Sequence, residues 1–262
     1  MANRPTESEK WFDRYLVDHG YDPGDPEPDL GIRTNPDRLI SRDGKQVVCE
    51  IKQFEKDVVT MVAGQVRAIS SSEWFNPVRM AVKNAARQLK PLRDSGLPLA
   101  VLLANPKGMH VSLETTDVIH ALYGDPTWSI QIDPATGGAV ADPEFFAGLG
   151  GRLRNHHEYI SAVVLLRHRE NVQDYADAVA KEIKCDREPK TYEEAAELGK
   201  QYLEEMQRRE AAGEIPGGDY FFVDVIKTVS AQATPLPDDF FNGKRDSVWA
   251  LNSAAGGYVK VR

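Results

Sequence analysis

The stretch from Arg33 to Phe54, RTNPDRLISRDGKQVVCEIKQF, constrains the fold most, because it contains the pattern of a tight β-hairpin. Its centre, Arg42-Asp43-Gly44-Lys45, supplies an Asp-Gly turn, which is the strongest short hairpin signal. Apolar and β-branched residues after the turn predict a second strand from Gln46 to Gln53. Since side chains alternate between the faces of a strand, Glu50 and Lys52 share one face of it.

An acid and a base side by side in an apolar strand are costly to bury unless they are paired or bind a metal. One interpretation is an ordinary ion pair between Glu50 and Lys52 on the surface of a half-exposed strand. The other is a functional site that also includes Asp37, which follows Pro36 at the start of the first strand. The gap of 13 residues from Asp37 to Glu50 suits two neighbouring strands of one hairpin.

The order Pro36-Asp37, then Glu50-Ile51-Lys52 on the next strand, resembles the PD-(D/E)xK nuclease superfamily, which includes restriction endonucleases and many repair nucleases. The resemblance covers roughly the first 105 residues. It implies that Asp37 and Glu50 bind a divalent metal, Mg2+ or Mn2+, and that Lys52 helps to activate the attacking water. Hard oxygen ligands suit magnesium, the metal lowers the pKa of bound water, and a nearby cation stabilises developing charge.

The first helix is expected from Thr6 to about His19. Thr6 with Glu9 three residues later is the pattern of a capping box, and Gly20 ends the helix. Glu9 has two interpretations. It is either the carboxylate of the cap or, as the resemblance implies for an acid on the first helix, an additional metal ligand.

A second Pro-Asp pair, Pro28-Asp29, lies in the turn-rich segment between Tyr21 and Leu30. Asp29 therefore competes with Asp37 for the same role. Asp37 is preferred, because a strand continues directly from it, whereas Asp29 is followed by Gly31, which is typical of a loop.

A long helix is expected from Pro77, as its first residue, to Arg93. Its apolar stripe is expected to face the core. A second, basic stripe is either a solvated flank or a row of phosphate contacts in nucleic-acid binding. Gln88 lies on the same helix, and the resemblance implies a position near the site for it. The apolar stripe is Val78, Val82, Ala85, Leu89 and Leu92; the residues proposed to bind nucleic acid are Arg79, Lys83, Arg87 and Gln88.

The predicted fold class is α/β, a mixed sheet flanked by helices that resembles the restriction endonucleases, with additional helices and strands toward the C-terminus. A buried strand is expected from Pro98 to Ala104. The resemblance implies three strands in a meander between the first two helices, and the third is expected within Val58 to Ile69. The expected organisation is a nuclease-like core over residues 1–170 and an extension over 171–262, packed together as one domain overall.

Further elements are expected along the second half of the chain. They are a helix over Thr116–Tyr123, a hairpin over Trp128–Ile132 and Gly138–Ala141, a strand over Ile160–Arg167, helices over Asn171–Lys184 and Tyr192–Ala212, and a strand over Asp219–Val229.

Composition limits the partners. The 262 residues carry a net charge of −8, which argues against a general nucleic-acid binder, although a local basic surface remains compatible with a nuclease. No apolar run approaches the length of a membrane span, no signal peptide is evident, and two cysteines make no disulfide framework, so a cytoplasmic protein is expected.

The first functional hypothesis is a magnesium-dependent phosphodiesterase acting on DNA or RNA. The second is a catalytically inactive binding or regulatory module that retains the nuclease fold. A third is a metal-dependent enzyme with a small substrate. Because many enzymes of the superfamily act as dimers, a homodimer remains an alternative to a monomer.

Overall fold

The computed structural model describes residues 4–32, 35–57, 70–124, 126–129, 136, 144–147, 153, 156–183, 189–228, 230–252 and 257–262. Contacts divide the chain into two units. The first joins Met1–Arg167 with Phe222–Arg262, and the second is His168–Phe221. The second unit begins near residue 170, where the predicted core ends, and the strands after Phe222 belong to the first unit.

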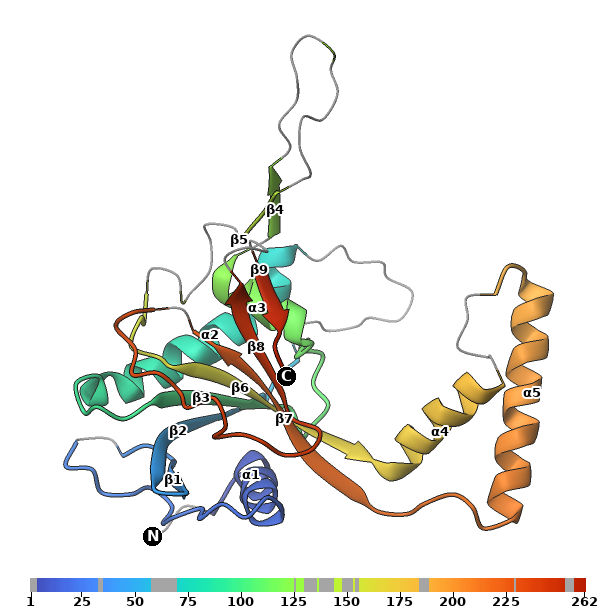
Figure 1. Cartoon of the computed structure of the whole chain (residues 1–262), viewed down its shortest axis with the longest axis horizontal. Helices are drawn as coiled ribbons and strands as arrows, with labels where there is room; N and C mark the ends of the chain where they lie inside the picture. Colours follow the sequence, from blue (N-terminus) through green and yellow to red (C-terminus); the bar gives the residue numbers. More distant parts are fainter. Residues whose placement is uncertain are drawn as a thin grey trace. The chain divides into compact units, whose positions relative to one another are not determined.

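A mixed sheet forms the centre of the first unit and confirms the α/β class (Figure 1). Its described strands follow the order β1-β2-β3-β6-β7-β8-β9, so the sheet combines both halves of the sequence. The strands are β1 (Arg38–Arg42), β2 (Lys45–Gln53), β3 (Leu99–Ala104), β6 (Ala162–Glu170), β7 (Asp219–Lys227), β8 (Ser247–Asn252) and β9 (Gly257–Lys260).

The expected hairpin is confirmed as β1 and β2. The two strands pair antiparallel, with Arg42 opposite Lys45 across the turn. Asp43 and Gly44 both have positive φ values, 49° and 74°, as the two-residue turn of a right-twisted hairpin requires. β2 then pairs in parallel with β3, all six residues of which are buried, as its continuous apolar run predicted.

Helices cover the two faces of this part of the sheet. α2 (Ser71–Leu89) and α3 (Thr115–Tyr123) share one apolar cluster with Val48, Val101 and Leu103 of the strands. α1 (Glu7–Asp18) packs against the other face, where the Oε1 of Gln53 accepts hydrogen bonds from the backbone N–H and the hydroxyl of Ser8. By strand alternation, Glu50 and Lys52 face α2, whereas Cys49, Ile51 and Gln53 face α1.

The predicted helix starting at Pro77 was wrong at its N-terminus. α2 begins six residues earlier, where Ser70 and Glu73 form a capping box, and Pro77 lies inside the helix. A proline inside a helix removes one backbone hydrogen bond, and here the box at one end and the buried stripe along the helix maintain the helical conformation. The stripe is confirmed, and the last predicted turn is a short 3₁₀ helix, η1 (Lys90–Leu92).

The third strand of the meander, expected within Val58 to Ile69, lies outside the described residues. At the other edge of the hairpin, the loop before β1 runs antiparallel to β1, with isolated bridges between Asp22 and Ser41 and between Pro26 and Arg38. The prolines of this loop interrupt a regular ladder, because proline has no N–H to donate, and the sequence of this segment accordingly shows only a loop pattern.

Other expected elements are present with small shifts. Two short strands, β4 (Pro126–Ser129) and β5 (Glu144–Ala147), pair antiparallel. Residues 130–132 and 138–141 of the predicted hairpin lie outside the described residues, so that hairpin stays a prediction. The C-terminal segment contributes to the core, because Phe240 and Phe241 are buried.

The second unit consists of α4 (Asn171–Glu182) and α5 (Tyr192–Ala211) with the adjoining ends of β6 and β7. Within this unit, Arg209 of α5 lies 2.8 Å from the carboxylate of Glu182 and above the ring of Tyr175. None of the helices in the described part of the chain is long and apolar enough to cross a membrane.

A partly buried ion pair, in which Arg38 is buried and Asp13 is 39% exposed, fixes α1 to the start of β1. The guanidinium of Arg38, whose side chain is 4% exposed, donates to both carboxylate oxygens of Asp13, over 3.0 and 2.9 Å. It also donates to the carbonyl of Asp37 over 2.7 Å. Two parallel hydrogen bonds of this kind restrict both position and orientation, so this pair positions the residue that precedes it, Asp37.

We expect Asp13→Ala to lower the free energy of unfolding by about 2–3 kcal/mol, because it leaves a buried guanidinium without its counter-ion. Asp18→Ala is the matched control on the same helix, since Asp18 pairs with Arg14 at the surface; its effect should stay within about 0.5 kcal/mol. Urea unfolding of the two variants measures the difference, and equal losses would contradict a special role for Asp13.

Candidate functional site

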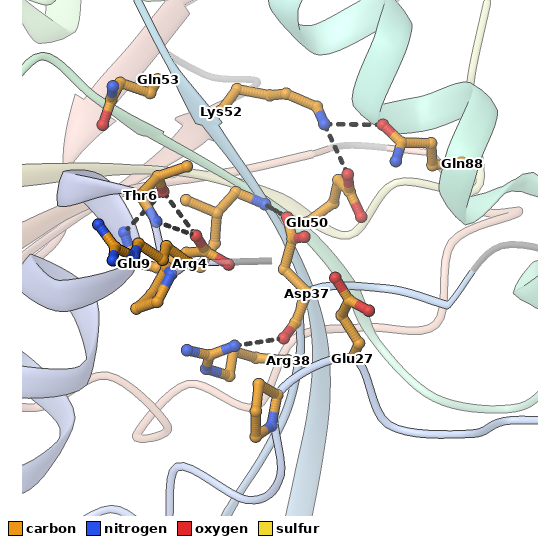
Figure 2. A pocket seen from close by; sticks show the side chains of 13 residues that line it. Arg4, Thr6, Glu9, Glu27, Asp37, Arg38, Glu50, Lys52, Gln53 and Gln88 are labelled. Carbon is orange, nitrogen blue, oxygen red and sulfur yellow. Dashed lines mark hydrogen bonds and ion pairs between the residues drawn. The ribbon is translucent and has the colours of Figure 1, made fainter. Parts of the chain in front are cut away.

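A pocket of about 590 Å3 lies where β1 begins, and residues of α1, β2 and α2 meet around it (Figure 2). Four segments contribute its walls: the chain leading into α1, the loop before β1, the paired strands β1 and β2, and one residue of α2. The lining residues are Arg4, Pro5, Thr6, Glu9, Pro26, Glu27, Asp37, Arg38, Glu50, Ile51, Lys52, Gln53 and Gln88.

Asp37 is fixed by the backbone of the neighbouring strand. Its Oδ2 accepts a hydrogen bond from the N–H of Ile51 over 2.6 Å, which links the residue before β1 to the middle of β2. Burial raises the pKa of the Asp37 carboxyl, while this hydrogen bond and the charge of Lys52 oppose the increase. The second oxygen remains available to the pocket, toward which the side chain points in Figure 2.

Glu50 is the most unusual residue of the pocket, because its carboxylate is buried on the strand. Its side chain is 1% exposed. One oxygen, Oε1, accepts from the ammonium of Lys52 over 2.6 Å, and the other, Oε2, is buried without a hydrogen-bond partner among the described residues. Burial first, and the charge of Asp37 second, raise the pKa of Glu50 to about 7. A surface ion pair, the ordinary interpretation of Glu50 and Lys52, does not describe this arrangement.

Lys52 is held between two oxygens. Its Nζ donates to Glu50 and also to the Oε1 of Gln88 on α2, over 2.7 Å (Figure 2). The resemblance implied a position near the site for Gln88, and the structure places it there. Lys52 remains 23% exposed, so its ammonium borders both the buried carboxylate and the open part of the pocket.

Glu9 fits both interpretations of its sequence position in part. Its Oε2 accepts from the N–H and the hydroxyl of Thr6, which confirms the capping box. The same carboxylate lines the pocket, and its charge contributes to raising the pKa of Asp37. α1 lies on the face of the sheet opposite to Glu50. Glu9 therefore lines the pocket from the side of α1, and Glu50 lines it from the side of α2.

The predicted basic row of α2 is not brought to the pocket. Arg79 donates to the carbonyl of Ala121 on α3 and lies above the ring of Phe75, 5.6 Å from its centroid. Lys83 and Arg87 follow at one-turn intervals on that side of the helix, half-buried and exposed respectively. Gln88 and this row therefore lie on different flanks of α2.

The alternative aspartate, Asp29, does not line the pocket. Its carboxylate accepts from the N–H of Gly31 in a local turn. The polar lining residues that the sequence did not indicate as part of the site are Arg4, Thr6, Glu27, Arg38 and Gln53. Glu27 has a positive φ of 50°, which is uncommon for a residue with a side chain. No periodic pattern indicates Arg4 or Glu27, and strand alternation turns Gln53 to the face opposite to Lys52, so it does not indicate Gln53 either.

The donor set around Asp37 and Glu50 fits a hard divalent cation in its chemistry. Carboxylate oxygens are the ligands that Mg2+ prefers, usually with several waters, and a buried carboxylate oxygen without a partner is suited to such an ion. Among the described residues, however, no group of three His, Cys, Asp or Glu side chains is arranged to hold a metal. Two protein carboxylates would therefore have to be completed by water or substrate oxygens.

Comparisons with models of protein families, with curated proteins and with solved structures gave no match.

In metal-free buffer we expect Glu50→Gln to stabilise the protein at pH 8 by roughly 3 kcal/mol and to have little effect near pH 5. The folded state binds the proton of Glu50 more tightly than the unfolded state, whose pKa is 4.5. The cost of ionising Glu50 is therefore absent below pH 4.5, increases up to about pH 7, and is complete above that pH. Urea unfolding from pH 5 to pH 8 measures it.

Glu55→Gln is the control for this experiment. Glu55 is exposed just beyond the same strand, and hydrogen bonds from Lys107 and Gln53 lower its pKa. Its removal should cost a little stability at high pH, which is the opposite sign. Stability curves of wild type and Glu50→Gln that run parallel across this pH range would contradict a raised pKa at Glu50.

Proposed function

We propose that the protein is a metal-dependent phosphodiesterase of the PD-(D/E)xK type that hydrolyses nucleic acid. The observation that supports it most is the buried Oε2 of Glu50, which has no hydrogen-bond partner in the part of the chain that the structure describes and shares one pocket with Asp37 and Lys52. A structural ion pair would need only one of these carboxylates. Two carboxylates and a lysine around a pocket instead match the chemical requirements of phosphate hydrolysis.

Asp37 and Glu50 would hold the metal ion. When bound, a divalent ion supplies Lewis-acid polarisation of the phosphate and a water of lowered pKa. The N–H of Ile51 fixes Asp37 through one oxygen, which leaves the other for coordination. The buried site of Glu50 limits its movement, so both carboxylates are positioned before substrate arrives.

Lys52 would orient the attacking water and stabilise the negative charge that develops on the phosphate. In the reaction, the water oxygen forms the new bond to phosphorus, one P–O ester bond breaks, and the leaving oxygen takes up a proton. Gln88 would hold the ammonium of Lys52 by its Oε1, since the two atoms lie 2.7 Å apart. No co-reactant besides water is required.

The order of elements supports the proposal. α1 is followed by the edge segment that bridges β1, then by β1 and β2, α2 and β3. This order supplies a helix, three antiparallel segments, a helix and a strand, which is the order that the resemblance implies for the common core of the superfamily.

The net charge of −8, which argues against a nucleic-acid binder, is unevenly distributed between the two units. The second unit, His168–Phe221, contains fourteen acidic and eight basic residues, so it carries −6 of the net charge of −8. The unit that contains the pocket carries only −2. The overall acidity therefore does not describe the surroundings of the site.

The alternative is a binding or regulatory module with the same fold and no catalysis. The observation that favours it is that the described residues provide no three-ligand metal group. A nuclease should both bind the metal and cleave nucleic acid, whereas a non-catalytic module should cleave none.

Mn2+ or Mg2+ at about ten times its Kd should stabilise the wild type by about 1.4 kcal/mol, or roughly 3 to 6 °C in Tm, because it binds only the folded state. The double variant Asp37→Asn, Glu50→Gln should show no such increase, whatever its own Tm. Differential scanning calorimetry with and without metal measures both. A metal-induced increase of equal size in the variant would locate the ion elsewhere.

Lys52→Ala should reduce metal-dependent cleavage of DNA or RNA by at least about a hundredfold, because it removes a group that acts on the reacting phosphate. The metal-induced increase in Tm should persist, since both carboxylates remain. Lys107→Ala, which removes an exposed lysine paired with Glu55, is the control. Equal cleavage by wild type and Lys52→Ala would exclude the proposed role, and a wild type that binds metal but cleaves no nucleic acid would favour the non-catalytic module.

A further inference from the structure

The charges that line the pocket are nearly balanced, which is unusual for a surface that follows a nucleic-acid backbone. Two of its bases already have partners: Arg38 binds Asp13, and Lys52 binds Glu50 and Gln88. The remaining base, Arg4, makes no ion pair or hydrogen bond with the described residues. The acids of the lining are Glu9, Glu27, Asp37 and Glu50, and the bases are Arg4, Arg38 and Lys52.

The size of the pocket also limits the substrate. Its volume of about 590 Å3 falls within the range of sites that enclose a small ligand. Residues from separate segments line it, among them Arg4–Thr6, the Pro26–Glu27 segment and Gln88 of α2. Recognition of a duplex instead uses a broad, strongly basic surface with many phosphate contacts. The basic row of α2 does not extend this pocket, because it lies on the other flank of the helix.

We propose that the pocket takes the end of a single-stranded nucleic acid, and that Arg4 binds the phosphate next to the one that is cleaved. This inference rests on the proposed function. A single strand is flexible, and its bases can be unstacked and enter a walled site one at a time, whereas a duplex cannot. A guanidinium binds phosphate through two parallel hydrogen bonds, and Arg4 has all of its donors available.

The position of Arg4 suits this role. Arg4 lies two residues before Thr6, the N-cap of α1. Thr6 is fixed by its hydrogen bonds with Glu9. Arg4 is therefore attached to a fixed point of the rim while its own side chain is exposed. A phosphate at the rim would be bound by Arg4, and the neighbouring phosphate would lie deeper, beside Lys52 and the two carboxylates.

The first test compares three forms of one oligonucleotide sequence: a linear single strand, the same strand in a blunt duplex, and the same strand closed into a circle. Each is made as DNA and as RNA. With Mg2+ or Mn2+, wild type should cleave the linear single strand at least about tenfold faster than the duplex or the circle, and a preference for either sugar agrees with this inference.

The second test isolates Arg4 without cleavage. In the Lys52→Ala background, adding Arg4→Gln should weaken binding of a labelled single strand by about tenfold and reduce the slope of log affinity against log salt by about 0.7. Arg14→Gln is the matched control, because Arg14 is an exposed arginine of α1 that pairs with Asp18 outside the pocket. Fluorescence anisotropy measures both variants.

The outcomes are distinguishable. Cleavage of the circle or the duplex as fast as the linear strand overturns this inference and leaves the proposed function standing. Cleavage of none of the substrates overturns the proposed function and the inference with it. Equal effects of Arg4→Gln and Arg14→Gln on affinity and salt dependence overturn the assignment of Arg4.

Discussion

The burial of the Glu50 carboxylate is the constraint on which the rest of the site depends. An ionised carboxylate without exposure costs several kcal/mol unless its charge and its hydrogen-bonding oxygens are compensated. Lys52 donates to one oxygen of Glu50 and is itself held by Gln88, whereas the second oxygen of Glu50 finds no partner among the residues that the structure describes. A stable core would accept an apolar residue at this position more readily, so the stability lost here indicates a functional requirement.

Much of the fold could be predicted, because its strongest signals are local. The Asp-Gly turn, the capping box of Thr6 and Glu9, and the apolar run of β3 each depend on residues close together in the sequence. The start of α2 was missed because Pro77 was interpreted as a first helical residue, although Ser70 and Glu73 carry the same capping pattern. The edge segment at Pro26 could not be predicted, since its pairing with β1 is set by tertiary contacts rather than by its own pattern.

The residues of the candidate site also fall into two groups, those that the sequence predicts and those that it does not. The placement of Asp37, Glu50 and Lys52 around one pocket follows from strand alternation and hairpin register, which a sequence contains. Arg4 and Glu27 come from irregular segments, whose positions depend on how α1 and the loop pack. The sequence does predict that Gln88 and the basic row are separated. The four-residue spacing of Arg79, Lys83 and Arg87 places all three on one flank of the helix, and Gln88 does not follow that spacing.

The pairing of β1 with β2 has a consequence for how this chain can change during evolution. Arg38 stands opposite Cys49, so Asp37 and Glu50 meet only in this register. Inserting or deleting one residue between Asp37 and Glu50 would either slip the ladder, turning Glu50 and Lys52 toward α1 and Cys49 toward α2, or force a bulge. Homologues that retain this chemistry should therefore keep the hairpin length constant or change it by two residues at the turn, while loops elsewhere vary freely.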